Sequence, residues 1–128
     1  MIVLDASVLI AYLDSEDAHH TRAETLLAQE IDDDFAASSL TVAEVLVMPA
    51  RQLRLDAARE ALADLDVKEL ALAGDSAVKL AQLRASTGLK MPDCCVLLAA
   101  EDVQARVASF DDRLNDAATS RKLVVVRS

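Results

Sequence analysis

The sequence predicts an α/β protein in which helices cover both faces of a central parallel sheet. Short apolar runs, each long enough for one strand, alternate with longer stretches whose apolar residues recur at helical spacing. Strands that alternate with helices in this way are typical of a parallel sheet covered on both faces. A chain of 128 residues can bury one core, so we expect a single domain over residues 1–128.

The first half of the chain begins with an apolar run that stops at Asp5. We expect strands over residues 2–5 and 35–38, and helices over residues 6–14, 17–29, 41–48 and 55–65. Ser38 or Ser39 supplies the N-cap of the third helix, and Pro49 ends or kinks that helix.

The second half continues the alternation. We expect strands over residues 67–72, 106–109 and 123–126, a helix over residues 75–87, a helix that begins at Pro92, and a short helix between the last two strands. The helix after Pro92 is apolar nearly all round and is therefore buried. Within it, Cys94 and Cys95 lack the spacing of a metal site and are interpreted as buried thiols. The whole pattern predicts three layers around a sheet of about five strands.

Composition and charge exclude several classes of protein. The longest unbroken apolar run is far too short to cross a bilayer, and no signal peptide is evident, so we expect a soluble cytoplasmic protein without a membrane partner. The net charge is −9 and aromatic residues make up 2% of the chain. These values exclude a protein that grips nucleic acid through a basic surface or a row of stacking aromatics. If the substrate is a polyanion, something other than side chains must supply positive charge, and a divalent cation could do so.

Four acids lie where a parallel sheet gathers its ligands, outside the carboxyl ends of the strands. Asp5 ends the first strand, and Asp111 follows the strand over residues 106–109. Glu44 lies one turn into the helix after the second strand, and Asp93 lies in the first turn of its helix. The four carboxylates are therefore candidates for one shared site.

Each acid also has a simpler structural interpretation. Asp93 could complement a helix dipole, Glu44 could lie on an exposed helix face, and Asp111 could be a turn residue. Asp5 resists such an interpretation, because an unpaired carboxylate at the end of a buried strand is costly. A shared site accounts for all four positions together.

Clustered carboxylates match the requirements of a hard divalent cation. Mg²⁺ and Mn²⁺ prefer oxygen ligands, and Mg²⁺ combines a few carboxylates with water and phosphate oxygens. The cation would relieve the repulsion between the acids and activate a water molecule for attack on phosphorus. The chemistry indicated is hydrolysis of a phosphodiester.

The segments that carry these acids resemble those of a known family. "DASVLIAYL", "SSLTVAEVL", "LKMPDCCVLLAA" and "VASFDDRL" occur in the order typical of the PIN domain, and the chain resembles the VapC-type toxins of toxin–antitoxin pairs. The resemblance implies a Mg²⁺-dependent endoribonuclease, with Mn²⁺ as a possible substitute. It places Asp5, Glu44, Asp93 and Asp111 at the family's acidic catalytic and metal-binding positions. Whether Asp111 or Asp112 is the fourth acid stays open, as does the number of ions.

The same resemblance implies supporting residues and partners. Ser7 and Ser109 match small polar positions whose hydroxyls support the first acid or the metal shell. The expected partners are an RNA substrate, a second copy of the chain in a homodimer, and a cognate antitoxin whose basic segment enters the acidic cleft. The expected products carry a 5′ phosphate and a 3′ hydroxyl.

Some polar residues have no assigned role in this scheme. His19 and His20 have no Cys or carboxylate partner at ligand spacing, so we expect solvated helix residues. Scattered arginines could line an RNA path, although a solvated surface position is the simpler interpretation of each: Arg22, Arg51, Arg54 and Arg113.

Two other functions remain open at this point. A Mg²⁺-binding receiver domain for signalling would be expected to show an acidic pair after the first strand, whereas Ala6 and Ser7 follow Asp5 here. A catalytically silent PIN fold that only binds a partner is the second alternative, and the presence of four acids argues against it.

Overall fold

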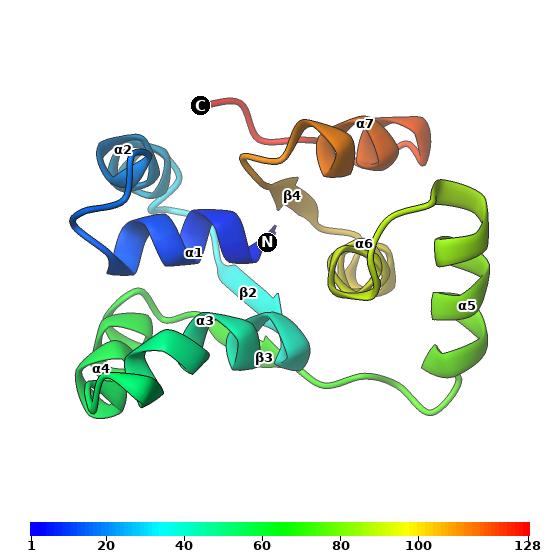
Figure 1. Ribbon diagram of the computed structural model, residues 1–128. Coiled ribbons are helices and arrows are strands. Elements are labelled where there is room, and N and C mark those ends of the chain that lie inside the picture. Colours follow the sequence, from blue (N-terminus) through cyan, green and yellow to red (C-terminus); the bar gives the residue numbers. More distant parts are fainter.

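The computed structural model describes all 128 residues as a parallel sheet between two layers of helices (Figure 1). The sheet has four strands in the order β3-β2-β1-β4. The strands are β1 (Ile2–Leu4), β2 (Phe35–Ser38), β3 (Lys68–Leu70) and β4 (Arg106–Ala108). All three strand pairings are parallel, as the alternating pattern predicted.

The seven helices divide between the two faces of the sheet. They are α1 (Ala6–Leu13), α2 (His20–Gln29), α3 (Ser39–Arg51), α4 (Leu55–Asp64), α5 (Ser76–Thr87), α6 (Met91–Val103) and α7 (Asp112–Ser120). Helices α1 to α4 gather on one side of the sheet in Figure 1, and α5, α6 and α7 gather on the other. The predicted three-layer α/β architecture is confirmed.

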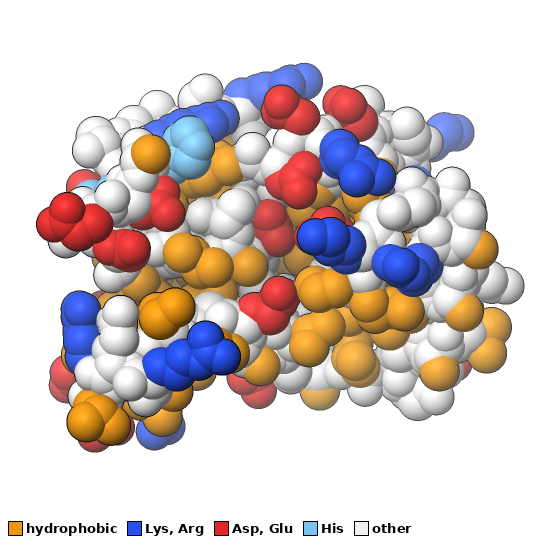
Figure 2. Space-filling model, viewed as in Figure 1, with side chains coloured by type: hydrophobic (Ala, Val, Ile, Leu, Met, Phe, Trp, Pro, Cys, Tyr) orange, Lys and Arg blue, Asp and Glu red, His pale blue; other side chains and the backbone are white.

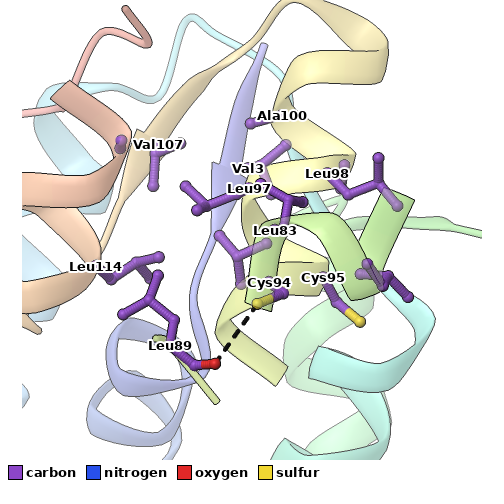
Figure 3. Close-up of a cluster of buried hydrophobic side chains, with 14 of the residues drawn as sticks. Val3, Leu83, Leu89, Cys94, Cys95, Leu97, Leu98, Ala100, Val107 and Leu114 are labelled. Atoms are coloured by element: carbon purple, nitrogen blue, oxygen red, sulfur yellow. Dashed lines mark hydrogen bonds between the residues drawn. The ribbon is translucent and has the colours of Figure 1, made fainter. Parts of the chain in front are cut away.

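Alternation along β1 divides the core into two halves. Val3 packs with residues of α5, α6 and α7, whereas Ile2 and Leu4 pack with residues of α1 and α2. This division follows from the two-residue period of a strand, and both faces are apolar because both are covered. Figure 3 shows the half of the core that contains Val3, in which Cys94 and Cys95 lie fully buried among leucines. Burial raises the pKa of both thiols, in agreement with their interpretation as core residues.

Prolines and caps act close to where the sequence placed them. The Ser38 hydroxyl accepts a hydrogen bond from the Thr41 N–H at 3.2 Å and caps α3. However, α3 continues through Pro49 to Arg51, so the predicted end at Met48 is wrong. Pro49 lies in the last turn, where it removes a single backbone bond, and the helix still closes because the Gln52 N–H donates to the Met48 carbonyl at 3.0 Å.

The predicted fifth strand, over residues 123–126, forms only an isolated parallel bridge between Val107 and Val125. The Val107 N–H donates to the Val124 carbonyl at 2.9 Å, and the Val107 carbonyl accepts from the Val126 N–H at 2.8 Å. A ladder would need the backbone around Ser109 to continue this pattern. The chain turns away there instead, and the Phe110 N–H donates to the Ser7 hydroxyl.

Ion pairs hold the amino ends of β1 and β4 together. The Met1 ammonium lies 2.7 Å from Asp33, and the Arg106 guanidinium donates to Glu30 at 2.8 Å and to Asp33 at 2.9 Å. Hydrogen bonds from the Met1 ammonium, and then from Arg106, hold the pKa of Asp33 well below its usual range. These acids are therefore structural. None of the seven helices combines the length and the apolar character that crossing a membrane requires.

Candidate active site

Asp5 is a buried carboxylate that hydroxyl groups stabilise. It follows β1 directly, and its side chain is 6% exposed. Its Oδ2 atom accepts hydrogen bonds from the Ser7 hydroxyl at 2.8 Å and from the Ser109 hydroxyl at 2.7 Å. No cation forms an ion pair with Asp5, so hydroxyl donors supply the stabilisation that a buried charge requires.

The same two hydroxyls connect Asp5 to the residues that follow β4. The Ser7 hydroxyl accepts from the Phe110 N–H at 3.0 Å, and the Ser109 hydroxyl accepts from the Asp111 N–H at 2.9 Å. Two segments that lie more than a hundred residues apart in sequence thus form one network at the carboxyl edge of the sheet. This network sets the position of Asp111 relative to Asp5.

Between the two adjacent acids, the geometry favours Asp111. Asp111 Oδ1 caps α7 by accepting from the Arg113 N–H at 2.9 Å and the Leu114 N–H at 3.4 Å. Asp111 also contributes to the raised pKa of Asp93, whereas Asp112 is the exposed first residue of α7. Asp111 is therefore both a capping residue and a neighbour of the other acids.

The pKa of Asp93 reflects burial and the charges of the other three carboxylates. Burial, and then the charges of Asp5, Asp111 and Glu44, raise the pKa of Asp93 to about 6. Partial desolvation and the charge of Asp5 also raise the pKa of Glu44, although its side chain is largely exposed on α3. The four predicted acids therefore lie close enough to repel one another.

The position of Asp93 at a helix N-terminus does not by itself explain the direction of this pKa shift. A helix N-terminus stabilises the ionised form of an acid and lowers its pKa. Asp93 lies in the first turn of α6, with Lys90 as a further stabilising charge, yet its pKa is raised. Desolvation and the neighbouring carboxylates therefore dominate its environment.

Asn115 is a polar residue near this network that sequence reasoning missed. Its amide donates to the Ser109 carbonyl at 3.0 Å, and its Oδ1 atom is buried without a hydrogen-bond partner. Asn115 lies four residues after Asp111, on the same face of α7, and this spacing is the signal that could have identified it.

A groove lies beside Glu44, between α1, α3 and α4, with a volume of about 900 Å³. Its walls are mainly apolar and include Ile10, Leu13, Val47, Met48 and Ala61. Figure 2 shows acidic side chains through the centre of this face of the molecule, with hydrophobic side chains on both sides. The acidic region therefore adjoins an apolar surface.

His19 is exposed as predicted, whereas His20 differs from its predicted solvated position, and its Nε2 atom lies 3.3 Å from a carboxylate partner, Glu24, that was not expected. The His20 Nδ1 atom lies 2.7 Å from the Ala11 carbonyl, because α2 packs against α1, so this side chain is half-buried. His19 precedes α2, and its ring centroid lies 5.4 Å from that of Phe110. The contact between His19 and Phe110 joins residues that are distant in sequence, which is why spacing alone could not reveal it.

Comparison with known proteins identifies the family of this chain. The family model of the PIN domain matches residues 2–119. The chain belongs to the PIN domain family. The receiver-domain alternative is thereby removed, and PIN domains are typically nucleases. No curated protein sequence matches the chain.

Solved structures share the PIN fold at low sequence identity. They include VapC20 of Mycobacterium tuberculosis, described as a toxin that cleaves the sarcin–ricin loop, with a TM-score of 0.75, 17% identity and 100% of both chains covered. FitAcB from Neisseria gonorrhoeae has a TM-score of 0.73 and 22% identity, with 99% of this chain and 97% of that chain covered. A toxin–antitoxin complex from Klebsiella pneumoniae has a TM-score of 0.71 and 24% identity, with 87% of each chain covered.

PIN domains generally use divalent metals, and the donor set of this PIN domain suits one. All four acids offer the oxygen ligands that hard cations prefer. Their mutual repulsion, evident in the raised pKa of Asp93, is what a divalent cation would relieve. The side chains do not form a preorganised cage, because no group of three His, Cys, Asp or Glu side chains is arranged to hold one ion.

Proposed function

We propose that this PIN domain is a metal-dependent endoribonuclease of the VapC type that hydrolyses RNA phosphodiester bonds. The observation that carries the proposal is the gathering of four carboxylates at the carboxyl edge of the sheet, where Asp5, Asp111 and Glu44 act on the pKa of Asp93. Net charge and composition support it, because a chain with a charge of −9 needs a cation to approach a polyanion.

The four acids would divide two tasks in the proposed site. Asp5, Glu44 and Asp93 would hold Mg²⁺ or Mn²⁺, directly or through water, and Asp111 would complete the site or position a second ion. When bound, the metal supplies Lewis acidity and lowers the pKa of a coordinated water. Ser7 and Ser109 both donate to the Oδ2 atom of Asp5 and so orient this carboxylate, with its other oxygen left for a ligand.

The proposed reaction is attack of water on phosphorus, which yields a 5′ phosphate and a 3′ hydroxyl. The 2′ hydroxyl of the substrate is not the nucleophile in this scheme. Preference for RNA would therefore come from the shape of the substrate and the access of single-stranded loops to the acids.

The proposed protein partners are a second copy of the chain and an antitoxin. A basic segment of an antitoxin would complement the four acids, and apolar side chains beside that segment would suit the groove next to Glu44. The structural likeness to a chain from a toxin–antitoxin complex supports this partner class. Mixing the protein with the product of a neighbouring small gene and measuring both mass and residual cleavage would test the antitoxin and the homodimer together.

Cleavage of a structured RNA in the presence and absence of metal tests the enzymatic proposal. We expect cuts with Mg²⁺ and none after addition of EDTA. The variant Glu44→Gln should cut at least about 100-fold more slowly, because a metal-site carboxylate is lost. Glu60→Gln is the matched control, because Glu60 is exposed on α4 and forms no ion pair.

A catalytically silent PIN module is the second candidate, favoured by the absence of a preorganised metal cage. Under this alternative, Glu44→Gln and the wild-type protein would behave alike toward RNA. Cleavage that persists in EDTA would contradict the role of the metal.

A further inference from the structure

An arginine stacks on an aromatic ring at the edge of the acidic site. The Cζ atom of Arg22 lies 4.3 Å from the ring centroid of Phe110, and the His19 ring packs against the same phenyl ring at an interplanar angle of 48°. We name these three residues the Arg22 platform. Phe110 is half-buried, whereas Arg22 and His19 are exposed, so the platform has one open side.

The platform lies directly beside the candidate catalytic acids. Phe110 stands between Ser109 and Asp111 in the chain, and its N–H donates to the Ser7 hydroxyl at 3.0 Å. Both Ser7 and Ser109 donate to Asp5. The network that positions Asp5 therefore also positions the ring on which Arg22 rests.

Arg22 is a cation without an anionic partner. Its recorded side-chain hydrogen bond runs from Nε to the Ser128 hydroxyl at 2.7 Å, and no carboxylate lies within ion-pair distance. By contrast, Arg106 and Arg121 are both engaged by glutamates. The two terminal nitrogens of Arg22 have no hydrogen-bond acceptor in the protein, which leaves them available to a ligand.

We propose that the Arg22 platform is an RNA subsite that holds a nucleotide next to the scissile phosphate. The guanidinium donates to a phosphate oxygen, and its outer face stacks on a nucleobase while its inner face rests on Phe110. Arginine suits both contacts, because its planar fork matches phosphate geometry and its faces stack on π-systems. The proposal rests on the proposed nuclease function. It names a residue that would bind RNA on a protein whose net negative charge otherwise repels RNA.

Charge favours RNA over a protein segment as the occupant. The antitoxin expected here carries basic side chains toward the acids, and Arg22 would repel such a segment. A polyanion is attracted by Arg22, which offsets part of its repulsion by the surrounding carboxylates. In Figure 2, histidine and basic side chains lie next to the acidic side chains at the upper left of this face, so both charges border one surface.

Steady-state cleavage of an RNA hairpin with a single-stranded loop tests this subsite. We expect Arg22→Gln to raise KM about 10-fold and to leave kcat within about 2-fold, because the interaction is made with the bound substrate as well as the transition state. Arg22→Lys should recover part of the loss, since it keeps the charge without the plane. Phe110→Leu should raise KM about 3-fold through loss of the ring face.

Binding of the same RNA in the Asp5→Asn background provides the second readout. Loss of Arg22 should lower the slope of log affinity against log salt by about 0.7, as expected for one phosphate contact to a single strand. Ser128→Ala removes the bond to the terminal residue and keeps the guanidinium, so it should leave KM unchanged. Arg59→Gln, at an exposed arginine on α4 without an ion pair, should also leave KM unchanged.

The outcomes separate this inference from the proposed function. If the wild-type protein cuts RNA and Arg22→Gln has an unchanged KM, the subsite is wrong and the nuclease function stands. If Ser128→Ala reproduces the loss, Arg22 acts by tethering the terminal segment and the subsite is again wrong. A change in affinity for an oligoarginine peptide with an unchanged KM for RNA would assign the platform to a protein partner and overturn the proposal. Absence of any wild-type cleavage would instead remove the nuclease function.

Discussion

Both edges of the sheet carry carboxylates, but the two groups of carboxylates differ in ion pairing and in the direction of their pKa shifts. At the amino edge, Asp33 and Glu30 are bound by Arg106 and Met1, and the pKa of Asp33 is lowered. At the carboxyl edge, no ion pair relieves the acids, and the pKa of Asp93 is raised to about 6.

The difference distinguishes acids that stabilise the fold from acids that we propose to bind a ligand. Paired acids favour the folded state, whereas crowded acids without a cation oppose it. Mutually repelling carboxylates at the ligand-binding edge of a parallel sheet are therefore candidates for a functional site, and paired carboxylates at the other edge are not.

Replacing one acid of each kind by asparagine should give the largest expected effect, a loss of RNA cleavage in one variant only. Asp5→Asn should reduce RNA cleavage at least about 100-fold with the fold retained, because a metal ligand is lost. Asp33→Asn should leave the cleavage rate nearly unchanged and lower the melting temperature, because it weakens the ion pairs with Met1 and Arg106 that stabilise the fold. Cleavage assays and circular dichroism measure the two effects. Equal cleavage by Asp5→Asn and the wild-type protein would remove the functional half of the comparison.

The hydroxyls around Asp5 provide the next test. Ser109→Ala removes a donor to the buried Asp5 carboxylate, so we expect a loss of about 1 to 3 kcal/mol in the free energy of unfolding and slower cleavage. Chemical denaturation measures the loss. Ser120→Ala, at an exposed serine on α7, should be neutral. A neutral Ser109→Ala would show that Asp5 does not depend on this hydroxyl.

The raised pKa of Asp93 predicts a gain of stability on its removal. In EDTA at neutral pH, Asp93→Asn should increase the free energy of unfolding by about 1 to 2 kcal/mol. This range is smaller than the full pKa shift implies, because solvent partly screens the charge of the half-buried Asp93 side chain. Because the folded protein binds this proton more tightly than the unfolded chain, the gain is complete above about pH 6 and shrinks as the pH falls toward 3.8.

Denaturation at several pH values checks this prediction, with Asp116→Asn on α7 as an exposed control. Addition of Mg²⁺ should stabilise the wild-type protein more than Asp93→Asn, because the variant lacks one ligand. A gain that persists unchanged at low pH would mean that charge repulsion is not its cause.

The smallest expected effect concerns the amino edge. The lowered pKa of Asp33 contributes stability above its ordinary pKa of 3.8, and this contribution is lost as the pH falls below that value. The melting temperature of wild-type protein should therefore exceed that of Asp33→Asn by less as the pH falls. For Asp93→Asn the difference also shrinks on acidification, but there the variant is the more stable protein. A constant difference across this range would argue against the ion pairs as its source.

The sequence predicted correctly those features that depend on residues close together in the chain. The apolar run Ile2–Leu4, the cap at Ser38 and the buried thiols in α6 follow from periodicity, capping preference and the absence of metal spacing. Two predictions were wrong where packing with other segments determines the structure. Helix α3 continues through Pro49, which lies in its last turn. Residues 123–126 pair with β4 only at Val107 and do not form a strand.

The candidate site shows the same division. The strand ends and helix starts that carry Asp5, Glu44, Asp93 and Asp111 can be read from the sequence, and so can the sheet edge at which they gather. The family resemblance placed the hydroxyls of Ser7 and Ser109 near the first acid, but only the folded chain shows that both donate to one oxygen of Asp5. The preference for Asp111 over Asp112 and the stacking of Arg22 on Phe110 also came from the folded chain. Hydrogen bonds and stacking depend on distances of a few ångströms between segments far apart in sequence, and only tertiary packing sets such distances.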